Sequence, residues 1–359
     1  MNKRLELISK KSTEKKKLNL SEKKEDTVGI KNYVKVAQEN LKKFDEKAWA
    51  KGSGYALPSY PYIEEKLEGL ESGLYLFAGE SNSGKSATMM NLISDIANHE
   101  ENNLFGVYYS LDDSSQEIIA RVIAMNEGIP ISVCAKPSRF QEKIDEGDEE
   151  ATLFQTWLDK RQAGLDKLVS NSNKFIIEDS TTIRNSEDLY DHMCKVRTFV
   201  KAKNPNANII VAFDSINDIK LSNYQAHSTE DRHAKTAETV KQWTVDLDIV
   251  IFASIHLRKL NGNRRPTMDD LKYSQEYAYE ASLTWLIHND VSKNKESAQI
   301  YYEQEDIEEK RPVIEMDWAK NKKSSYKGRS FMFFVPESSK TTECDRTLVE
   351  QFDSVIYEL

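Results

Sequence analysis

The sequence predicts an α/β fold with a mostly parallel central sheet, and two observations support this prediction. Strand-forming runs alternate along the chain with stretches that have the apolar spacing of helices, as a parallel sheet with crossover helices requires. In addition, a complete G-x-x-x-x-G-K-[ST] motif occupies residues 79–86, between a strand-like run at 74–78 and a helix-like run at 87–97. With 359 residues, 39% of them hydrophobic, the chain is long enough for one large α/β domain plus an extension.

Charge is unevenly distributed along the chain. Residues 1–50 contain 14 lysines and arginines against 8 aspartates and glutamates, whereas the whole chain has a net charge of −9. We expect residues 1–26 to form a disordered basic tail, which serves either for solubility or as a partner- or DNA-binding arm. The acidic body argues against nonspecific coating by nucleic acid, but it does not exclude a local basic channel.

Cysteine usage and hydropathy indicate the compartment. Cys134, Cys194 and Cys344 are far apart and form no C-x-x-C pair, so we expect neither a disulfide framework nor a zinc site. No apolar stretch approaches the length of a membrane span, and the N-terminal residues lack the apolar core of a signal peptide. These features predict a soluble, cytoplasmic protein without a membrane partner.

Residues 27–50 are predicted to form an amphipathic helix. Val34, Ala37, Leu41, Phe44 and Ala48 recur at helical spacing and form an apolar stripe that needs a surface to cover. A Gly-Ser-Gly break at 52–54 follows the helix. We therefore place one domain at 51–340 and a C-terminal tail at 341–359.

The domain at 51–340 is expected to alternate strands with helices. Strands are predicted at 74–78, 105–110, 174–178, 208–213, 249–254 and 283–288, followed by a hairpin at 313–335. Helices are predicted at 87–97, 115–126, 156–169, 186–203 and 234–247. Residues 141–150 are acidic, which predicts a loop.

The motif at 79–86 predicts a nucleotide site. Its glycines allow backbone N–H groups to form a nest around phosphate oxygens, and the next helix adds the partial positive charge of its N-terminus. Lys85 is placed to reach the β- and γ-phosphates, and the Ser86 hydroxyl to bind Mg²⁺. We expect ATP and Mg²⁺ as cofactors, with the nucleotide held by Gly79, Glu80, Ser81, Asn82, Ser83, Gly84, Lys85, Ser86 and Ala87. The alternative is a glycine-rich surface turn that carries a lysine.

Carboxylates at two strand ends complete the predicted chemistry. Asp214 follows a largely apolar strand and is placed to hold Mg²⁺ together with Ser86. Asp112 and Asp113 end the strand that follows the phosphate-loop helix, where a carboxylate can activate the attacking water. We favour Asp112 for this role, although paired aspartates before Ser114 also suit the start of a helix.

The order of these motifs resembles the RecA-like C-terminal ATPase domain of DnaB-type replicative helicases, over residues 54–336. Residues 110–112 (SLD) are similar to the family's S-L-E block, and the strand that ends in Asp214 is similar to its Walker B block. Residues 253–258 (ASIHLR) are similar to the family's L-S-Q-L-x-R. The most specific match is residues 265–274 (RPTMDDLKYS), which resemble R-P-x-x-x-D-L-R-x-S.

The resemblance implies roles for several catalytic residues. It puts Asp112 in the place of the family's catalytic glutamate, and His256 in the place of the glutamine that senses the γ-phosphate. In the family, a K-x-R-x-G hairpin reaches the nucleotide of the neighbouring subunit. Lys322 occupies the arginine-finger position here, with Arg329 or Lys320 as alternatives.

The resemblance also implies loops that bind the backbone of single-stranded DNA inside a ring. One candidate is the segment 220–233, which includes Lys220 and Arg232. The other candidate cluster comprises Arg258, Lys259, Arg264 and Arg265. An ordinary surface loop is the alternative for this second cluster.

Taken together, the resemblance implies an ATP-dependent DNA helicase that forms a homo-oligomeric, typically hexameric, ring. Such a ring translocates on single-stranded DNA during replication by hydrolysing ATP at subunit interfaces, with a primase or a loader as further partners. The helix at 27–50 corresponds to the family's linker helix, which packs on the adjacent subunit. We expect no counterpart of the family's N-terminal helical domain. This compact layout is similar to that of phage-encoded helicases. If the chain is encoded by a phage, we expect it in the cytoplasm of the host.

Two other functions stay open on the sequence alone. One is a recombination ATPase of the RecA/RadA type, although the block at 265–274 and the hairpin favour a helicase. The other is an ATP-dependent switch or scaffold that hydrolyses ATP poorly, because Asp112, His256 and Lys322 all depart from the family pattern at catalytic positions.

Overall fold

The computed structural model describes residues 24–49, 54–172, 174–181, 183, 185–262, 264–273, 275–304 and 307–357. The chain divides into two compact units, Met1–Ser53 and Gly54–Leu359. In the first unit, α2 spans Lys24–Trp49, and residues 1–23 of the expected basic tail lie outside the described residues. Its exposed large apolar side chains are Tyr33, Val34, Val36, Leu41, Phe44 and Trp49.

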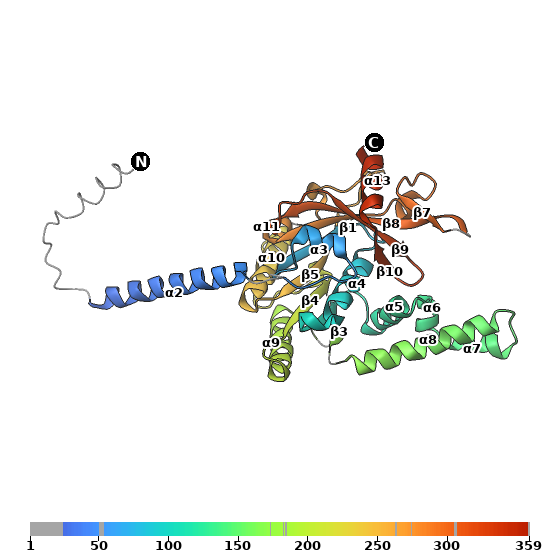
Figure 1. Ribbon diagram of the computed structural model, residues 1–359, viewed down its shortest axis with the longest axis horizontal. Coiled ribbons are helices and arrows are strands. Elements are labelled where there is room, and N and C mark those ends of the chain that lie inside the picture. Colours follow the sequence, from blue (N-terminus) through green and yellow to red (C-terminus); the bar gives the residue numbers. More distant parts are fainter. Residues whose placement is uncertain are drawn as a thin grey trace. The chain divides into compact units, whose positions relative to one another are not determined.

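In the described residues of the second unit, ten strands form one sheet in the order β10-β9-β8-β6-β1-β5-β4-β2-β3, with β7 paired to β8 (Figure 1). The strands from β6 to β3 in this order run parallel, whereas β7, β8, β9 and β10 pair in antiparallel fashion. The bounds are β1 Gly73–Gly79, β2 Leu104–Ser110, β3 Phe175–Asp179, β4 Asn208–Asp214, β5 Val250–His256, β6 Leu283–His288, β7 Tyr301–Gln304, β8 Ile307–Asn321, β9 Arg329–Val335 and β10 Lys340–Glu343. The predicted α/β fold with a mostly parallel sheet and a C-terminal hairpin is therefore confirmed.

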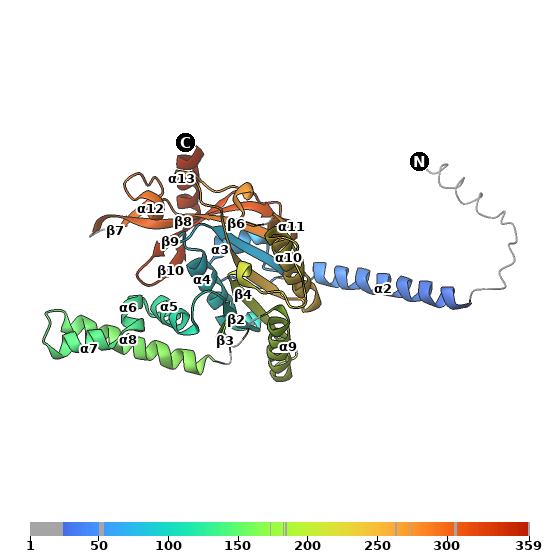
Figure 2. The ribbon, with the colours of Figure 1, turned by 180° about the vertical axis from the view of Figure 1, so that it is seen from behind.

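Helices cover both faces of the sheet (Figures 1 and 2). The helices of this unit are α3 Pro61–Leu67, α4 Lys85–Asn98, α5 Ser115–Glu127, α6 Ile131–Ala135, α7 Ser138–Asp145, α8 Ala151–Ser170, α9 Ser186–Lys203, α10 Thr229–Asp246, α11 Glu276–Glu280, α12 Asp290–Asn294 and α13 Arg346–Tyr357. Among them, α7 and α8 extend away from the sheet (Figures 1 and 2). In the described part of the chain, no helix combines the length and apolarity that crossing a membrane requires.

Alternate residues of β1 show how the two layers form. Leu74, Leu76 and Ala78 belong to a buried cluster with apolar residues of α9, α10 and α11. Tyr75 and Phe77 belong to a second buried cluster with apolar residues of α3, α4 and α5. Because successive side chains of a strand point to opposite faces, an almost wholly apolar strand is needed to pack against both layers.

Two expectations about the chain were wrong. Residues 141–150 were expected to form a loop, but only 146–150 do so, because α7 extends to Asp145; Phe140 on this helix packs against Phe154 and Trp157 of α8. The acidic composition of residues 141–150 did not reveal that the helix anchored by Phe140 continues into them. Residues 341–359 were expected to form a tail, but they contribute most of β10 and all of α13, and Val349 and Phe352 are buried against Phe331 of β9.

His233 of α10 is a buried polar group that links α10 to α11. Only 1% of its surface is exposed, its ring stacks on Tyr273 with centroids 4.3 Å apart, and Nδ1 lies 2.8 Å from the Tyr277 hydroxyl. Arg232 NH2 lies 2.9 Å from Nε2. A guanidinium group can only donate, so Nε2 accepts and Nδ1 carries the proton that is donated to Tyr277. Burial and the Arg232 charge lower the pKa of His233 to about 4.

The lowered pKa of His233 predicts a loss of stability on acidification. Between pH 6.5 and 4 the unfolded chain binds a proton at this residue and the folded chain does not. The free energy of unfolding therefore decreases as the pH is lowered, by up to about 3 kcal/mol. Urea unfolding of the wild type and of His233→Gln at several pH values measures this effect. We expect the wild type to lose more stability than the variant between pH 7 and pH 4. Parallel stability profiles would contradict the prediction.

Candidate active site

The phosphate loop joins β1 to α4, because β1 ends at Gly79 and α4 begins at Lys85. Gly84 has a φ of 98°, in the left-handed region, and a Cβ built there would lie 2.4 Å from Ile314 Cδ1. The backbone conformation therefore disfavours a larger side chain at this position, and a Cβ would also require the Ile314 side chain to move. Asn82 has a φ of 62°, which asparagine tolerates better than most residues. The residues of the motif thus suit the tight turn in which they lie.

Lys85 is buried at the base of this loop, with 7% of its surface exposed. Its Nζ donates a 2.7 Å hydrogen bond to the backbone oxygen of Glu80, which also accepts a 2.9 Å bond from the Ser83 hydroxyl. Burial lowers the pKa of Lys85 to about 8, while the Asp214 carboxylate acts in the opposite direction. At neutral pH the ammonium group is therefore mostly charged but poorly hydrated, so it favours an anionic ligand.

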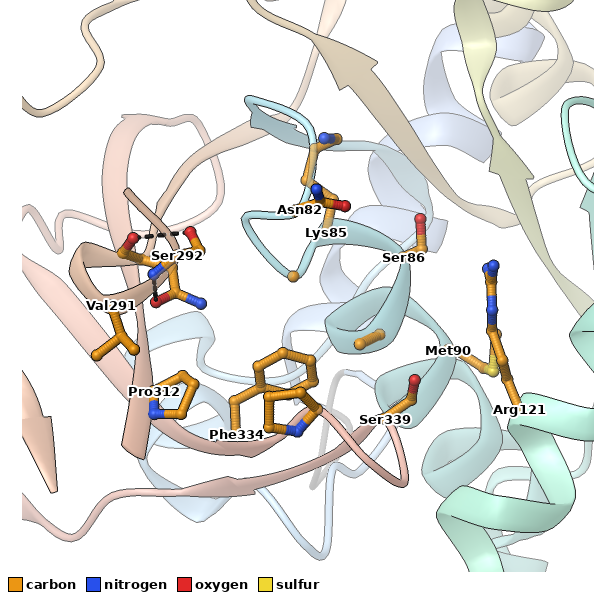
Figure 3. A pocket seen from close by; sticks show the side chains of 14 residues that line it. Asn82, Lys85, Ser86, Met90, Arg121, Val291, Ser292, Pro312, Phe334 and Ser339 are labelled. Carbon is orange, nitrogen blue, oxygen red and sulfur yellow. Dashed lines mark hydrogen bonds between the residues drawn. The ribbon is translucent and has the colours of Figure 1, made fainter. Parts of the chain in front are cut away.

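A cavity of about 510 Å³ adjoins the phosphate loop, a volume in the range of small-molecule and cofactor sites (Figure 3). One wall consists of the loop and the first turns of α4, and the facing wall consists of α12, β8 and the turn between β9 and β10. The lining residues are Asn82, Gly84, Lys85, Ser86, Ala87, Met90, Arg121, Asn289, Val291, Ser292, Pro312, Phe334, Pro336 and Ser339. Val291, Pro312 and Phe334 give the facing wall an apolar surface against which a planar base can pack.

Parallel pairing brings the predicted catalytic groups to one edge of the sheet. Gly79 of β1 pairs in register with His256 of β5, and Ser110 of β2 pairs with Asp214 of β4. Because these four strands are consecutive in the sheet, the phosphate loop, His256, Asp214 and the residues that follow Ser110 share its carboxyl edge. Ligands of open α/β sheets bind at this edge.

The Asp214 carboxylate is held by two hydroxyl groups. Tyr108 donates to Oδ2 at 2.7 Å, and Ser254 donates to Oδ1. Burial and the charge of Asp214 raise the pKa of Tyr108, so its hydroxyl stays a donor. An oriented carboxylate and the Ser86 hydroxyl, which lines the cavity, fit the oxygen ligands that Mg²⁺ prefers.

The structure gives Asp112 and Asp113 different surroundings. Asp113 Oδ2 lies 2.7 Å from Arg121 NH1, so its charge is already paired. Asp112 is exposed and makes no hydrogen bond or ion pair with any other described residue. Ser114 caps α5 through a capping box with Glu117, so neither aspartate is needed as a helix cap. Asp112 is therefore the carboxylate that is free to contact a ligand.

His256 ends β5 beside the phosphate loop. Its backbone N–H donates a 3.1 Å hydrogen bond to Asn217 Oδ1, which fixes the end of the strand. Burial and the nearby Lys85 charge lower the pKa of His256. A neutral imidazole has one donor and one acceptor nitrogen, so His256 can donate one hydrogen bond and accept another.

The hairpin lysines do not line the cavity of their own chain. Lys322 is exposed, and its Nζ lies 3.0 Å from the Tyr279 backbone oxygen at the end of α11. Lys320 is half-buried and its Nζ lies 2.6 Å from the same oxygen. Burial and the Lys322 charge lower the pKa of Lys320 to about 8. Lys322 is therefore the more accessible of these two cations.

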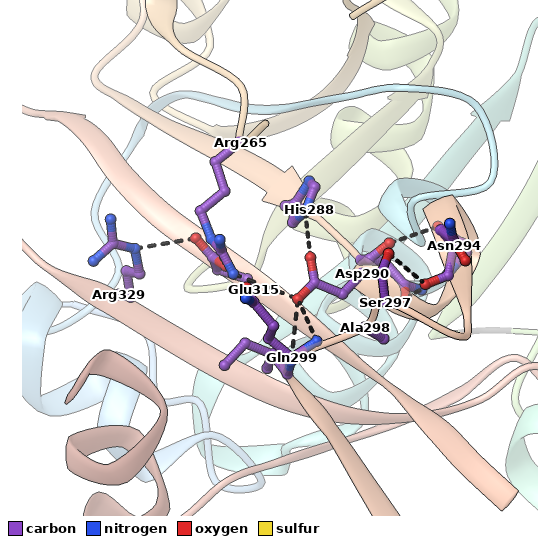
Figure 4. A network of polar contacts seen from close by, with 12 residues as sticks. Arg265, His288, Asp290, Asn294, Ser297, Ala298, Gln299, Glu315 and Arg329 are labelled. Atoms are coloured by element: carbon purple, nitrogen blue, oxygen red, sulfur yellow. Dashed lines mark hydrogen bonds and ion pairs between the residues drawn. The ribbon is translucent and has the colours of Figure 1, made fainter. Parts of the chain in front are cut away.

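Two of the arginines that were expected at functional positions, Arg265 and Arg329, belong to a buried ionic network (Figure 4). Glu315 of β8, with 3% of its side chain exposed, pairs with Arg265 Nε at 2.6 Å and with Arg329 Nε at 3.0 Å. Arg265 also lies 3.6 Å from Asp290, and Arg329 lies 3.3 Å from Asp353 of α13. These pairings count against Arg265 as a DNA contact and against Arg329 as a residue that acts on a neighbouring subunit.

The remaining basic candidates differ in accessibility. Lys220, Arg258 and Lys259 are exposed, follow strand ends at the carboxyl edge, and form no ion pair with another described residue. Arg264 makes a two-point ion pair with Asp270, with NH1 2.7 Å from Oδ2. Arg232 is half-buried against His233, as described above. A role in DNA binding stays a prediction for all of them, and the first three present their charge to solvent.

Several residues of the site have no recognisable motif. Arg121 lines the cavity from α5. The sequence offers one signal for this placement, which is that Arg121 lies two helical turns after Asp113. Phe334 and Pro312 reach the cavity because β8 and β9 fold back over α4. The alternation of apolar residues in the hairpin indicates a buried face, but it does not indicate what that face contacts.

Comparisons with known proteins agree with this architecture. A solved structure described as an ATPase domain is similar, with a TM-score of 0.67 and 18% identity over 86% of this chain and 99% of that one. A structure described as a DnaB-like replicative helicase and its interactions with primase is similar with a TM-score of 0.64 and 18% identity, over 95% of this chain and 70% of that one. No curated protein sequence matches. The model of the DnaB-like helicase C terminal domain matches residues 58–340, and the chain, with its RecA-like fold, therefore belongs to that family.

Proposed function

We propose that this protein is an ATP-dependent DNA helicase that assembles into a ring and translocates on single-stranded DNA by hydrolysing ATP at subunit interfaces. The observation that supports this proposal best is the division of the site. The phosphate loop, Asp214 and Asp112 lie at the carboxyl edge of the sheet, whereas Lys322 is exposed and follows the end of β8, which pairs with the first residue of β6 at the opposite edge. Such a site binds nucleotide within one subunit and needs a cation from another.

The cavity supports ATP as the nucleotide. Phosphates would lie in the loop against Lys85, and the base against the apolar wall that contains Phe334 and Pro312. Ser86, together with Asp214 through water, would hold Mg²⁺, which neutralises charge on the phosphate oxygens. The fixed Asp214 carboxylate costs little reorganisation on binding, because Tyr108 and Ser254 already orient it.

Asp112 is the group that we assign to water activation. Its carboxylate is exposed and unpaired among the described residues, whereas the neighbouring Asp113 is paired with Arg121. His256 would report the state of the γ-phosphate to the segment that follows β5, because it is neutral and adjoins the phosphate loop in register. That segment includes the exposed Arg258 and Lys259, which we propose as DNA contacts together with Lys220.

Assembly is supported by α2. Among the side chains of this helix that the structure describes, six large apolar ones are exposed, which is more than a soluble helix usually leaves uncovered. We propose that α2 packs on the adjacent subunit of a hexameric ring, as a linker helix. A primase or a loader is a further candidate partner, since one similar structure is a helicase described with its primase interactions.

A nucleotide-dependent switch that hydrolyses ATP slowly is the second candidate. It is favoured by Lys322, because an ammonium group cannot form the planar two-point clamp that an arginine finger provides. Stimulation of ATP hydrolysis by single-stranded DNA, together with unwinding of a forked duplex, distinguishes a helicase from a switch. If the intact protein shows neither activity, the helicase proposal is rejected.

Asp112→Asn is expected to retain ATP binding and to lower turnover by about 100-fold or more, the usual contribution of a positioned catalytic base. Asp113→Asn is the matched control, because it changes the neighbouring carboxylate, whose charge is paired with Arg121. Steady-state ATPase rates and the affinity for a fluorescent ATP analogue give the two parameters. A larger loss of turnover in Asp113→Asn than in Asp112→Asn would reverse the assignment.

Mixing two inactive variants tests the site in trans. Lys85→Ala should lose nucleotide binding, and Lys322→Ala should lose turnover while it still binds nucleotide. In a random one-to-one mixture about one interface in four combines an intact phosphate loop with an intact hairpin, so partial ATPase activity should return. Native mass spectrometry confirms that the variants co-assemble. Co-assembly without recovered activity would show that Lys322 does not act between subunits.

A further inference from the structure

Glu80 makes contacts through both its backbone and its side chain that the motif does not indicate. Its backbone oxygen accepts the hydrogen bond from Lys85, but its side chain is not among the residues that line the cavity. The carboxylate is instead largely buried, with 17% of the side chain exposed, between α12 and the segment that follows β5. A carboxylate withdrawn from water in this way needs polar partners, and both neighbouring elements supply one.

The first partner is Lys293 of α12, whose ammonium group forms an ion pair with Glu80 Oε2 and has 21% of its side chain exposed. The same short helix contributes Val291 and Ser292 to the cavity, and Asn289 at its N-cap also lines it. The ion pair therefore joins the phosphate loop to the wall that faces it. Because both groups are mostly buried, the pair is less screened by salt than a surface ion pair.

The second partner is the backbone N–H of Leu260, which donates a 3.1 Å hydrogen bond to Glu80 Oε1. Leu260 is buried, with 6% of its surface exposed, and it directly follows the exposed Arg258 and Lys259. A displacement of this basic segment would thus stretch or break a bond to the phosphate loop. The geometry connects an exposed cationic segment with the nucleotide site through one side chain.

We propose that Glu80 is a positioning residue with two separable roles: its ion pair with Lys293 sets the wall of the nucleotide cavity, and its bond to Leu260 couples the phosphate loop to the basic segment 258–259. The first role requires only that the cavity bind a nucleotide. The second role rests on the proposed helicase function, because it makes the segment's contact with single-stranded DNA change ATP turnover. Different measurements therefore decide the two roles.

Variants of the ion pair test the first role. Glu80→Gln retains an acceptor for Leu260 but loses the charge, and Lys293→Met loses the same pair from the other side. Both should weaken the binding of a fluorescent, non-hydrolysable ATP analogue by a similar factor of about three to ten. The charge-reversed double variant Glu80→Lys/Lys293→Glu should recover most of the affinity.

Glu80→Ala tests the second role, because it removes the acceptor for Leu260 as well as the ion pair. Its ATPase rate should lose most of the stimulation by single-stranded DNA, which Glu80→Gln should retain. The double variant should regain affinity but not stimulation, since a lysine at position 80 cannot accept the Leu260 bond. A residue that only supported the fold would lower both properties together.

Lys295→Met is the matched control. Lys295 lies two residues after Lys293 and pairs with the exposed Glu309 instead of Glu80, so this variant should bind the analogue as the wild type does. Thermal unfolding of each variant identifies any that fail to fold. Unequal effects of Glu80→Gln and Lys293→Met in folded protein, or a double variant that recovers no affinity, would overturn the first role.

Undiminished DNA stimulation in Glu80→Ala would overturn the second role. A wild type whose ATPase does not respond to single-stranded DNA would overturn the second role, and it would overturn the helicase proposal as well if the protein also fails to unwind a forked duplex. The binding measurements would still decide the first role, because they involve neither DNA nor turnover.

Discussion

Register between parallel strands is the constraint on which the site depends. The parallel strands β6, β1, β5, β4, β2 and β3 all end at the same edge of the sheet. Residues that are more than a hundred positions apart in sequence therefore become neighbours, as Ser110 and Asp214 do. The pairing requires strands with apolar residues on both faces, and β1 and β5 meet that requirement almost completely. A slip of one residue in this pairing would turn every side chain to the opposite face and would move Asp214 out of reach of Tyr108.

The buried ionic network has a different structural role. Glu315 lies between Arg265 and Arg329, so the two strands of the hairpin and the block that begins at Arg265 meet at one carboxylate. Removing one partner from such a group leaves a buried charge without compensation, whereas the intact network contributes little net stability compared with apolar packing. Its effect is to specify how the hairpin, α13 and the block that begins at Arg265 fit together.

Sequence patterns predicted the parts of the site that depend on local signals. The loop between β1 and α4 and the strand that ends in Asp214 follow from short runs of residues and lie where those runs predict them, whereas the role of Asp112 stays a prediction. The roles of Arg265 and Arg329 could not be predicted in this way, because their carboxylate partners lie on other strands and helices. The same reason hid α13, whose apolar stripe has meaning only once β9 supplies the surface that it covers.

The helix α2 has a consequence for how the folded protein depends on its own concentration. A helix of 26 residues that is rich in charged side chains and leaves its large apolar side chains exposed is only marginally stable in water by itself. If association covers the apolar side chains of α2, mass action links helix formation to assembly, and dilution then unfolds α2 while the sheet stays intact. The sheet of the chain would thus be folded at any protein concentration, whereas the folding of α2 would depend on the protein concentration.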